Sequence, residues 1–385
     1  MTPRTLPIRS KLPDTGVTIF TTMSRLALEH GAINLSQGFP DFNCAPELID
    51  AVTRYMREGH NQYAPMPGTI PLREALAMKI ERLYGRRYDP VTEITVTSGA
   101  TEALFASLTA LVHPGDDVLL FQPAYDSYVP AIQLSGGTPV FVTLRPPDYH
   151  IDWEAARRAL TPRTRVIVLN SPHNPTGMIL TADDMRELQR LLEQTDAFVI
   201  SDEAYEHIVF DGARHESMSR YPAIAERAIV IGSFAKTFHT TGWKIGWTAA
   251  PKALSGEVQS IHQWVTFAVN GAIQMAFAEM LRNDPECRGV GVFYQRKRDL
   301  FLSLIKDSRF RPLPCRGTFF QMMDYSAISS DRDTEVAMWL LEEHGVASIP
   351  PSSFLYGVDA GPILRFCFGK QDETLERAAE RLRKV

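Results

Sequence analysis

The sequence predicts an α/β protein in which a large domain holds a mostly parallel, seven-stranded sheet between helices and a smaller α+β domain lies beside it. Short β-rich runs alternate with helical patterns from residue 92 to 250, which is typical of a parallel sheet covered on both faces. After Pro251 the pattern changes to long helical stretches. The chain has 385 residues, and 44% of them are hydrophobic. A chain of this length usually exceeds what a single hydrophobic core can hold, so a second domain is expected.

Each expected strand is rich in β-branched or aromatic residues and is followed by turn residues. The expected strands cover residues 94–98, 117–121, 139–144, 165–170, 198–201, 228–233 and 246–250. Helical spacing of apolar residues lies between them, over residues 101–112, 152–160 and 181–194.

The C-terminal part of the chain is expected to begin with one long helical stretch over residues 255–283 and a second over 291–307. Short strands and helices then alternate to the end of the sequence. We expect residues 1–45 to join the small domain, residues 46–285 to form the large domain, and residues 286–385 to complete the small domain.

Composition argues against several classes of function. The net charge is −5 and no basic run exceeds a few residues, so nucleic acid is not an expected partner. No apolar window approaches a signal peptide core or a membrane helix, which favours a cytoplasmic protein. The four cysteines form no CxxC pair and the histidines are scattered, so we expect reduced packing thiols and no metal site.

The ends of the expected strands carry the candidate functional residues, because ligands of open α/β sheets bind at the carboxyl ends of the strands. Ser98, Gly99, Ala100 and Thr101 open a helix after the first strand, where bare N–H groups could bind an anion such as phosphate or form an ordinary N-cap. After the second strand, Tyr125 either lies flat on a planar ligand or packs in the core.

Three later strand ends carry an amide, a carboxylate and an amine. Asn174, in the turn "SPHNPTG", is either a plain turn residue or an amide aimed into the cleft. Asp202 directly follows a buried strand and therefore needs a cation or a helix N-terminus nearby. In "GSFAKTFHTTGWKIGW", desolvation would lower the pKa of Lys236 and make it a nucleophile, whereas a snorkelling lysine is the structural alternative.

No one of these residues is specific, but the set describes one ligand. A phosphate cradle, a flat aromatic ring, an asparagine, a carboxylate with Tyr205 three residues on, and an amine are the groups that pyridoxal 5'-phosphate requires.

Several long motifs resemble the class I aminotransferases of fold type I, and within them the bacterial methionine aminotransferases and the related kynurenine aminotransferases. The resemblance covers essentially the whole chain. The motifs that carry it are "NLSQGFPDF" (34–42), "NQYAPMPG" (61–68), "SGATEAL" (98–104), "PAYDSY" (123–128), "NSPHNPTG" (170–177), "SDEAYEHI" (201–208), "SFAKTFHTTGWKIGW" (233–247) and "LRFCF" (364–368).

The resemblance implies a role for each residue that contacts the cofactor ring. Lys236 would hold the cofactor covalently and later move the proton at the substrate's Cα. Asp202 would keep the ring nitrogen protonated, because an adjacent negative charge favours the cation. Asn174 and Tyr205 would hydrogen-bond the ring's 3-oxygen, and Tyr125 would stack on the ring face.

For the cofactor phosphate, the resemblance implies a site formed by Lys244, Ser233 and the backbone of residues 99–101. Many relatives have arginine at the position of Lys244, and lysine offers a point charge without the bidentate fork. Tyr63 matches a residue that reaches the partner subunit's cofactor phosphate, which implies a homodimer with shared active sites.

For the amino acid, the resemblance implies that Arg365 binds the α-carboxylate in a two-pronged contact, helped by Gly38 and Asn174. An unpaired guanidinium in the apolar strand "ILRFCF" would otherwise be costly, although a structural ion pair is the alternative. Phe20, Thr101 and Phe267 would neighbour the substrate side chain.

The implied activity is transfer of the α-amino group of methionine, and of aromatic amino acids, to a 2-oxo acid. Two alternatives keep the scaffold: a cysteine S-conjugate β-lyase and a kynurenine aminotransferase. Ser233-Phe-Ala-Lys236 also matches the S-x-x-K motif of acylating serines, but the companion motifs S-D-N and K-T-G are missing. A regulator on this scaffold would need a DNA-binding module, for which the residues before Asn34 offer too little room.

Overall fold

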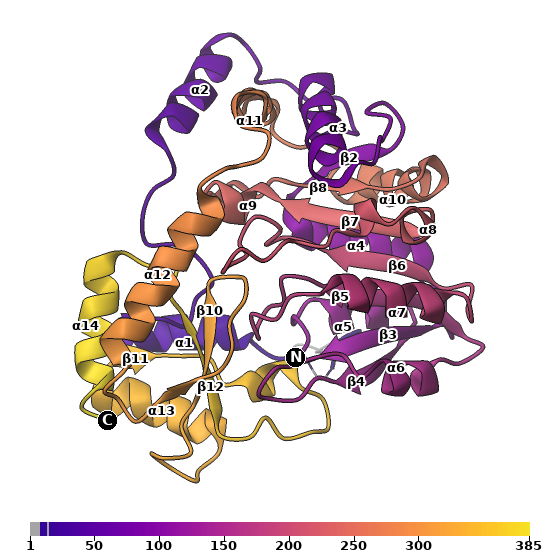
Figure 1. The fold of residues 1–385 in the computed structure, drawn as a ribbon. Helices are drawn as coiled ribbons and strands as arrows, with labels where there is room; N and C mark the ends of the chain where they lie inside the picture. The colour runs from indigo at the N-terminus through magenta and orange to yellow at the C-terminus, as the bar shows by residue number, and fades with distance from the viewer. Residues whose placement is uncertain (1–7, 14) are drawn as a thin grey trace, which may run out of the picture.

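The computed structural model describes residues 8–13 and 15–385 and places a large twisted sheet beside a second group of helices and short strands (Figure 1). Residues 1–7 and 14 of the predicted N-terminal segment lie outside the described residues. In Figure 1 the large sheet lies on the right, and the yellow and orange C-terminal helices gather at the lower left.

The seven predicted strands all form, and they form one sheet. Its strands are β2 (Ile94–Thr97), β3 (Asp117–Gln122), β4 (Thr138–Thr143), β5 (Thr164–Asn170), β6 (Phe198–Asp202), β7 (Ala228–Ser233) and β8 (Gly246–Ala249). The spatial order is β2-β8-β7-β6-β5-β3-β4, and every pairing is parallel except the two made by β8. The order reverses between β3 and β5, and the carboxyl ends of strands at such a switch point form a ligand-binding crevice.

Helices cover both faces because each inner strand is apolar on both sides. Val118 and Leu120 of β3 belong to one core with the first covering layer, and Leu119 and Phe121 belong to the opposite core. The first layer contains α4 (Gly99–Leu111), α5 (Tyr128–Leu134) and α10 (Lys252–Val265). The opposite layer contains α3 (Ile70–Tyr84), α6 (Trp153–Ala159), α7 (Ala182–Leu192) and α11 (Gly271–Asn283), with α2 (Pro46–Arg57) packed on α11.

The predicted single helical stretch over residues 255–283 is wrong, because α10 and α11 are separate helices. The backbone N–H groups of Thr266 and Phe267 both donate to the carbonyl of His262, at 3.0 and 2.9 Å, which closes α10. Phe267 then adopts a left-handed conformation with φ of 67°. Asn270 begins α11, since its Oδ1 accepts from the N–H of Ile273 at 3.0 Å. The apolar periodicity continues through this break and therefore concealed it.

The remaining elements bring the two ends of the chain together. The helices are α1 (Ile19–Glu29), α12 (Val290–Ile305), α13 (Asp333–His344) and α14 (Asp372–Leu382). The strands are β1 (Ile33–Asn34), β9 (Arg311–Pro312), β10 (Phe320–Asp324), β11 (Val346–Ala347) and β12 (Ile363–Cys367). β1 pairs in parallel with β11, and β10 lies between β12 and β9. The predicted domain boundaries at residues 45/46 and 285/286 stay a prediction.

Two short helices and the cysteines complete the description. β7 leads directly into α9 (Phe234–Thr237), a single helical turn, and α8 (Pro222–Ala225) is equally short. All four cysteines are free. None of the helices in the part of the chain that the structure describes combines the length and apolar character needed to cross a bilayer.

Candidate active site

A cavity of about 300 Å³ lies at the carboxyl ends of β5, β6 and β7, beside the first turn of α4. Residues 37–39 and β12 supply another wall. The cavity brings together all the predicted site residues except Tyr63 and Phe267. These residues are Phe20, Gly38, Gly99, Ala100, Thr101, Tyr125, Asn174, Asp202, Tyr205, Ser233, Lys236, Lys244 and Arg365.

Lys236 lies in the single turn of α9, which starts where β7 ends. The Ser233 hydroxyl caps this turn by accepting from the N–H of Ala235 at 3.2 Å. The Lys236 Nζ donates to the Gly38 carbonyl at 2.9 Å, and the rings of Tyr205 and Phe319 lie 5.7 and 5.5 Å away. Burial lowers the pKa of Lys236 to about 8. A substantial fraction of this side chain is therefore a neutral, nucleophilic amine near neutral pH.

Asp202 ends β6 and is held by neutral donors. The Tyr128 hydroxyl donates to Oδ2 at 2.7 Å, and the N–H of Ala204 donates to Oδ1 at 3.1 Å. Burial raises the pKa of Asp202, although these hydrogen bonds oppose the effect. Among the described residues no Lys, Arg or His lies within ion-pair distance of this carboxylate. The chemistry of the site therefore suits a ligand cation such as a protonated ring nitrogen.

Arg365 lies on β12 and is completely buried. Its Nη1 donates to the Asn174 Oδ1 and its Nη2 to the Ser36 carbonyl, both at 2.8 Å. The guanidinium lies 4.0 Å from the centre of the Phe320 ring, and Nε finds no hydrogen-bond partner within the described chain. Burial lowers the pKa of Arg365 to about 10. The charge of Asp126 also acts on Arg365, but no acidic residue of the described chain forms an ion pair with the guanidinium. The guanidinium therefore suits a carboxylate ligand.

Asn170, at the end of β5, joins these two parts of the site. Its Nδ2 donates to the Asp202 carbonyl at 2.9 Å, and its Oδ1 accepts from the N–H of Asn174 at 2.8 Å. Asn174 is thereby fixed between Asn170, which is bonded to the backbone of β6, and the guanidinium on β12. This arrangement explains why an amide is needed in the turn that follows β5.

The first turn of α4 forms the anionic end of the cavity. Gly99 has a φ of 72° and the Ser98 side chain makes no cap, so the first N–H groups of the helix face the cavity. The Lys244 Nζ lies 3.4 Å from the Thr101 hydroxyl. A Cβ on Gly246 would lie 2.5 Å from the Gly99 carbonyl carbon, so glycine lets β8 approach this turn. Backbone N–H groups, a hydroxyl and an ammonium suit a phosphate dianion.

Tyr63 and Phe267 do not line the cavity of this chain. The break between α10 and α11 directs the ring of Phe267 toward Tyr63, with ring centroids 5.4 Å apart. The Tyr63 side chain is 85% exposed. The predicted place of Phe267 beside the substrate is therefore not found within one chain, and the predicted contact of Tyr63 with a partner subunit stays a prediction.

Four residues of the site were missed from the sequence. Tyr128 lies in the quoted motif "PAYDSY" but was given no role, and Asn170 was seen only as the end of a strand. Ser36 acts through its carbonyl, which no side-chain motif could reveal. Phe320 comes from β10, more than two hundred residues after the first strand of the sheet, and forms an apolar wall with Phe20.

The family model for class I and II aminotransferases matches residues 30–382, almost the whole chain. The chain belongs to this family. Among curated aminotransferases, the methionine aminotransferase of Escherichia coli is 48% identical over the full length of both chains. A solved methionine aminotransferase structure from the same organism superposes with a TM-score of 0.97, covers 99% of this chain and is itself covered completely.

Other aminotransferases of the family act on different amino donors. A probable N-succinyldiaminopimelate aminotransferase of Mycobacterium tuberculosis is 40% identical, with 97% of each chain covered. A kynurenine–oxoglutarate transaminase of Dictyostelium discoideum is 35% identical, covering 96% of this chain and 94% of its own. The family and its fold, a large mainly parallel sheet between helices, are thus the ones that the sequence predicted.

Proposed function

We propose that this aminotransferase moves the α-amino group of methionine, and of aromatic amino acids, to a 2-oxo acid with pyridoxal 5'-phosphate as its cofactor. One observation carries the proposal. A single cavity holds a lysine with a pKa of about 8, a buried carboxylate with neutral partners, and a buried guanidinium that forms no ion pair among the described residues. These are an amine nucleophile, a partner for a ring cation and a partner for an α-carboxylate.

The cofactor, when bound, would supply an aldehyde that condenses with amines and a protonated ring that withdraws electrons from the substrate's Cα. Lys236 would first bind that aldehyde and then, displaced by the substrate amine, carry the proton away from Cα. Its bond to the Gly38 carbonyl holds Nζ inside the cavity. The neighbouring rings of Tyr205 and Phe319 keep water from the amine and so keep its pKa low.

The other residues would bind and orient. Asp202 would hold the proton on the ring nitrogen, while Tyr205 and Asn174 would donate to the ring's 3-oxygen and Tyr125 would stack on the ring. Lys244, Ser233 and the first turn of α4 would bind the phosphate. Their joint exposure to one cavity supports these assignments.

The small number of cations in the cavity favours a substrate whose side chain is apolar. Its basic side chains are Lys236, Lys244 and Arg365. The proposal uses all three, for the amine, the phosphate and the α-carboxylate, so this chain offers no further cation for a side-chain carboxylate. Phe20, Phe39 and Phe320 instead offer rings, and a thioether sulfur packs well against rings.

A half-reaction screen tests the proposal. The purified protein loaded with pyridoxal 5'-phosphate is mixed with single amino acids, and the loss of its visible absorbance is followed. We expect methionine and the aromatic amino acids to react faster than aspartate and glutamate. Faster reaction with a dicarboxylic amino acid would contradict the substrate assignment, and no reaction with any amino acid would contradict the activity.

Kynurenine remains a second candidate donor because the cavity walls are aromatic, and one ring or methylene changes discrimination by only about 1–3 kcal/mol. The β-lyase alternative is tested on cysteine S-conjugates without any 2-oxo acid. Release of pyruvate and ammonia under those conditions would favour the lyase.

We also propose a homodimer in which Tyr63 reaches the partner subunit's cofactor phosphate. The exposed ring of Tyr63 and its neighbour Phe267 support this proposal, because a large exposed aromatic pair is unusual on a monomer surface. A cytoplasmic location stays a prediction.

A further inference from the structure

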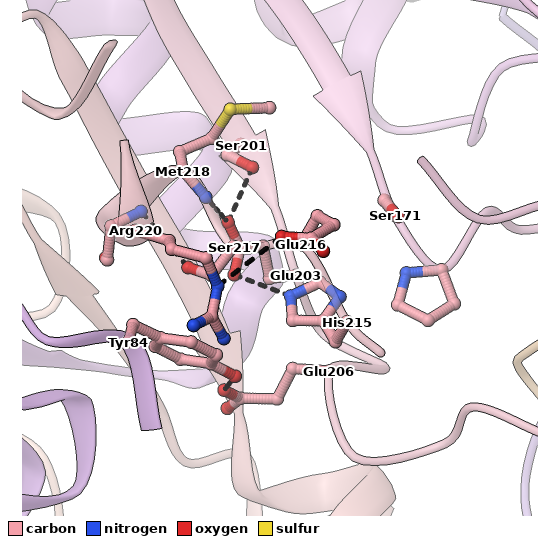
Figure 2. Close-up of polar contacts among 12 residues, drawn as sticks. Tyr84, Ser171, Ser201, Glu203, Glu206, His215, Glu216, Ser217, Met218 and Arg220 are labelled. Carbon is pink, nitrogen blue, oxygen red and sulfur yellow. Dashed lines mark hydrogen bonds and ion pairs between the residues drawn. The ribbon is translucent and has the colours of Figure 1, made fainter. Parts of the chain in front are cut away.

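A buried polar cluster surrounds Glu203, the residue that follows Asp202 in the chain (Figure 2). Successive residues of a strand project to opposite faces, so Ser201 and Glu203 point away from the side that Asp202 faces. The N–H of Glu203 donates to the Ile231 carbonyl at 2.8 Å, which extends the pairing of β6 with β7 by one residue. Glu203 is 1% exposed although it bears a carboxylate.

Neutral groups hold the Glu203 carboxylate. The Ser201 hydroxyl and the N–H of Met218 donate to Oε1 at 2.9 and 3.0 Å, and the His215 Nε2 donates to Oε2 at 2.8 Å, as Figure 2 shows. The other ring nitrogen of His215, Nδ1, has no partner among the described residues. A second proton there would bury an N–H without an acceptor, so the geometry favours a neutral ring with its proton on Nε2. Three donors then stabilise an ionised Glu203.

The neighbouring carboxylate, Glu206, is different because a cation compensates it. It forms a buried ion pair with Lys79 and accepts from the Tyr84 hydroxyl at 2.7 Å. A cation also compensates Glu216, whose carboxylate lies 3.4 Å from the Arg220 Nε. Within the described part of the chain, no Lys or Arg forms an ion pair with Glu203. Its negative charge therefore acts on the neighbouring end of β6.

The negative charge of Glu203 acts most directly on Asp202, because the two residues are adjacent in the chain. The pKa of Asp202 is raised mainly by burial, and the charge of Glu203 raises it further. The negative charge of Glu203 adds to the attraction that the Asp202 carboxylate exerts on a cation in contact with it.

We propose that Glu203 is a positioning residue that acts through Asp202, adding a second negative charge behind it so that the pair holds the protonated ring nitrogen of the cofactor. The inference rests on the proposed function and deepens it. His215, Ser201 and the N–H of Met218 maintain the charge of Glu203 without neutralising it. The ring nitrogen would thus contact the carboxylate of Asp202, and the carboxylate of Glu203 would lie on the far side of Asp202.

The test compares two ligands of the apoprotein: pyridoxal 5'-phosphate and its analogue with carbon in place of the ring nitrogen. Dissociation constants are measured by fluorescence titration for the full-length wild type and its variants. The ratio of the two constants isolates the ring-nitrogen contact, because all other contacts are shared. We expect Glu203→Gln, which keeps shape but removes charge, to reduce the preference for the nitrogen-containing ligand about fivefold or more.

Two variants separate charge from shape. Glu203→Asp keeps the charge but shortens the side chain, so its ratio should stay within about twofold of wild type, as should that of the matched control Glu216→Gln in the same loop. If Glu203→Gln does not fold, Ser201→Ala removes one donor and should lower the ratio in the same direction.

An unchanged ratio in folded Glu203→Gln, or in Ser201→Ala where it replaces that variant, would overturn the inference while leaving the proposed function intact. An equal loss of affinity for both ligands would also overturn it, since that result indicates a structural role alone. A wild type that binds neither ligand would overturn the proposed function and this inference together.

Discussion

Burial of the Arg365 guanidinium opposes folding but favours binding of a carboxylate ligand. The guanidinium is fully buried on β12 with only an amide oxygen and a carbonyl as partners, and its Nε is left without one within the described chain. A positive charge in such surroundings gains a direct ion-pair partner when an anion enters the cavity. The same features that raise the free energy of the empty site therefore increase the affinity for an amino acid carboxylate.

The first prediction concerns this residue. Arg365→Met should lower kcat/KM for methionine about a hundredfold or more, because a buried charge-assisted contact is lost. Its half-reaction is compared with that of 3-(methylthio)propylamine, which lacks the carboxylate. Wild type should strongly prefer methionine, and the variant should lose that preference while keeping the visible absorbance of the bound cofactor. A preference that survives the substitution would contradict the assigned carboxylate contact.

The second prediction follows from the pKa of about 8 at Lys236. Capture of pyridoxal 5'-phosphate by the apoprotein should quicken about tenfold per pH unit below pH 8 and level off above it, because only the neutral amine attacks. Nα-acetyl-lysine is the control, and its rate should keep rising toward pH 10. A protein profile that follows the free amine would contradict the lowered pKa.

The lowered pKa of Lys236 also makes the free energy of unfolding of the apoprotein depend on pH. The folded apoprotein holds the Lys236 amine with a pKa below the ordinary lysine value of 10.5, so between about pH 8 and 10.5 the unfolded chain binds more protons. The contribution of Lys236 to the free energy of unfolding therefore becomes more favourable as pH rises through that window. At neutral pH, burying its charge opposes folding.

At the scale of elements, the sheet was predictable and the helix break was not. Strands such as residues 165–170 were predicted correctly because their apolar runs are bounded by turn residues. The break between α10 and α11 depends on His262, which is tied to Glu102 at 2.6 Å and to the Met66 carbonyl at 3.0 Å. Contacts so distant in sequence leave no local pattern. For the same reason the backbone carbonyl of Ser36 escaped prediction.

The third prediction concerns how α3 is fixed to the loop after β6. Lys79 and Glu206 form an ion pair whose side chains are both 3% exposed, so Lys79→Met would leave an uncompensated carboxylate in the core. We expect a loss of about 3–5 kcal/mol in the free energy of unfolding, measured with urea. Arg82→Met on the same helix breaks an exposed pair with Glu286 and should cost far less, because solvent screens that pair. Equal losses in the two variants would contradict the role given to burial.

At the scale of the whole molecule, large apolar side chains gather where α10 ends. Trp264 is 83% exposed, and Val265, Phe267 and Tyr63 are exposed beside it or on the facing loop. A surface of this kind indicates contact with another protein, and the proposed homodimer supplies one. Because Tyr63 belongs to this surface, subunit contact and cofactor binding should be linked.

The fourth prediction tests that link by sedimentation. Trp264→Asp should shift the protein toward the monomer at low micromolar concentration and weaken binding of pyridoxal 5'-phosphate, because a charge opposes burial of the surface. Trp339→Asp, on α13 and also partly exposed, is the control and should change neither property. A Trp264 variant that sediments like wild type would contradict a dimer interface at this surface.

The pairing of β1 with β11 sets the order in which the cavity can be completed during synthesis. Residues 33–39 leave the ribosome early, yet their strand partner is residues 346–347 and the Ser36 carbonyl binds the guanidinium of Arg365. A nascent chain stalled before residue 346 has made every strand of the large sheet but lacks this wall. Binding of the proposed coenzyme is therefore expected only after nearly the whole chain has been synthesised.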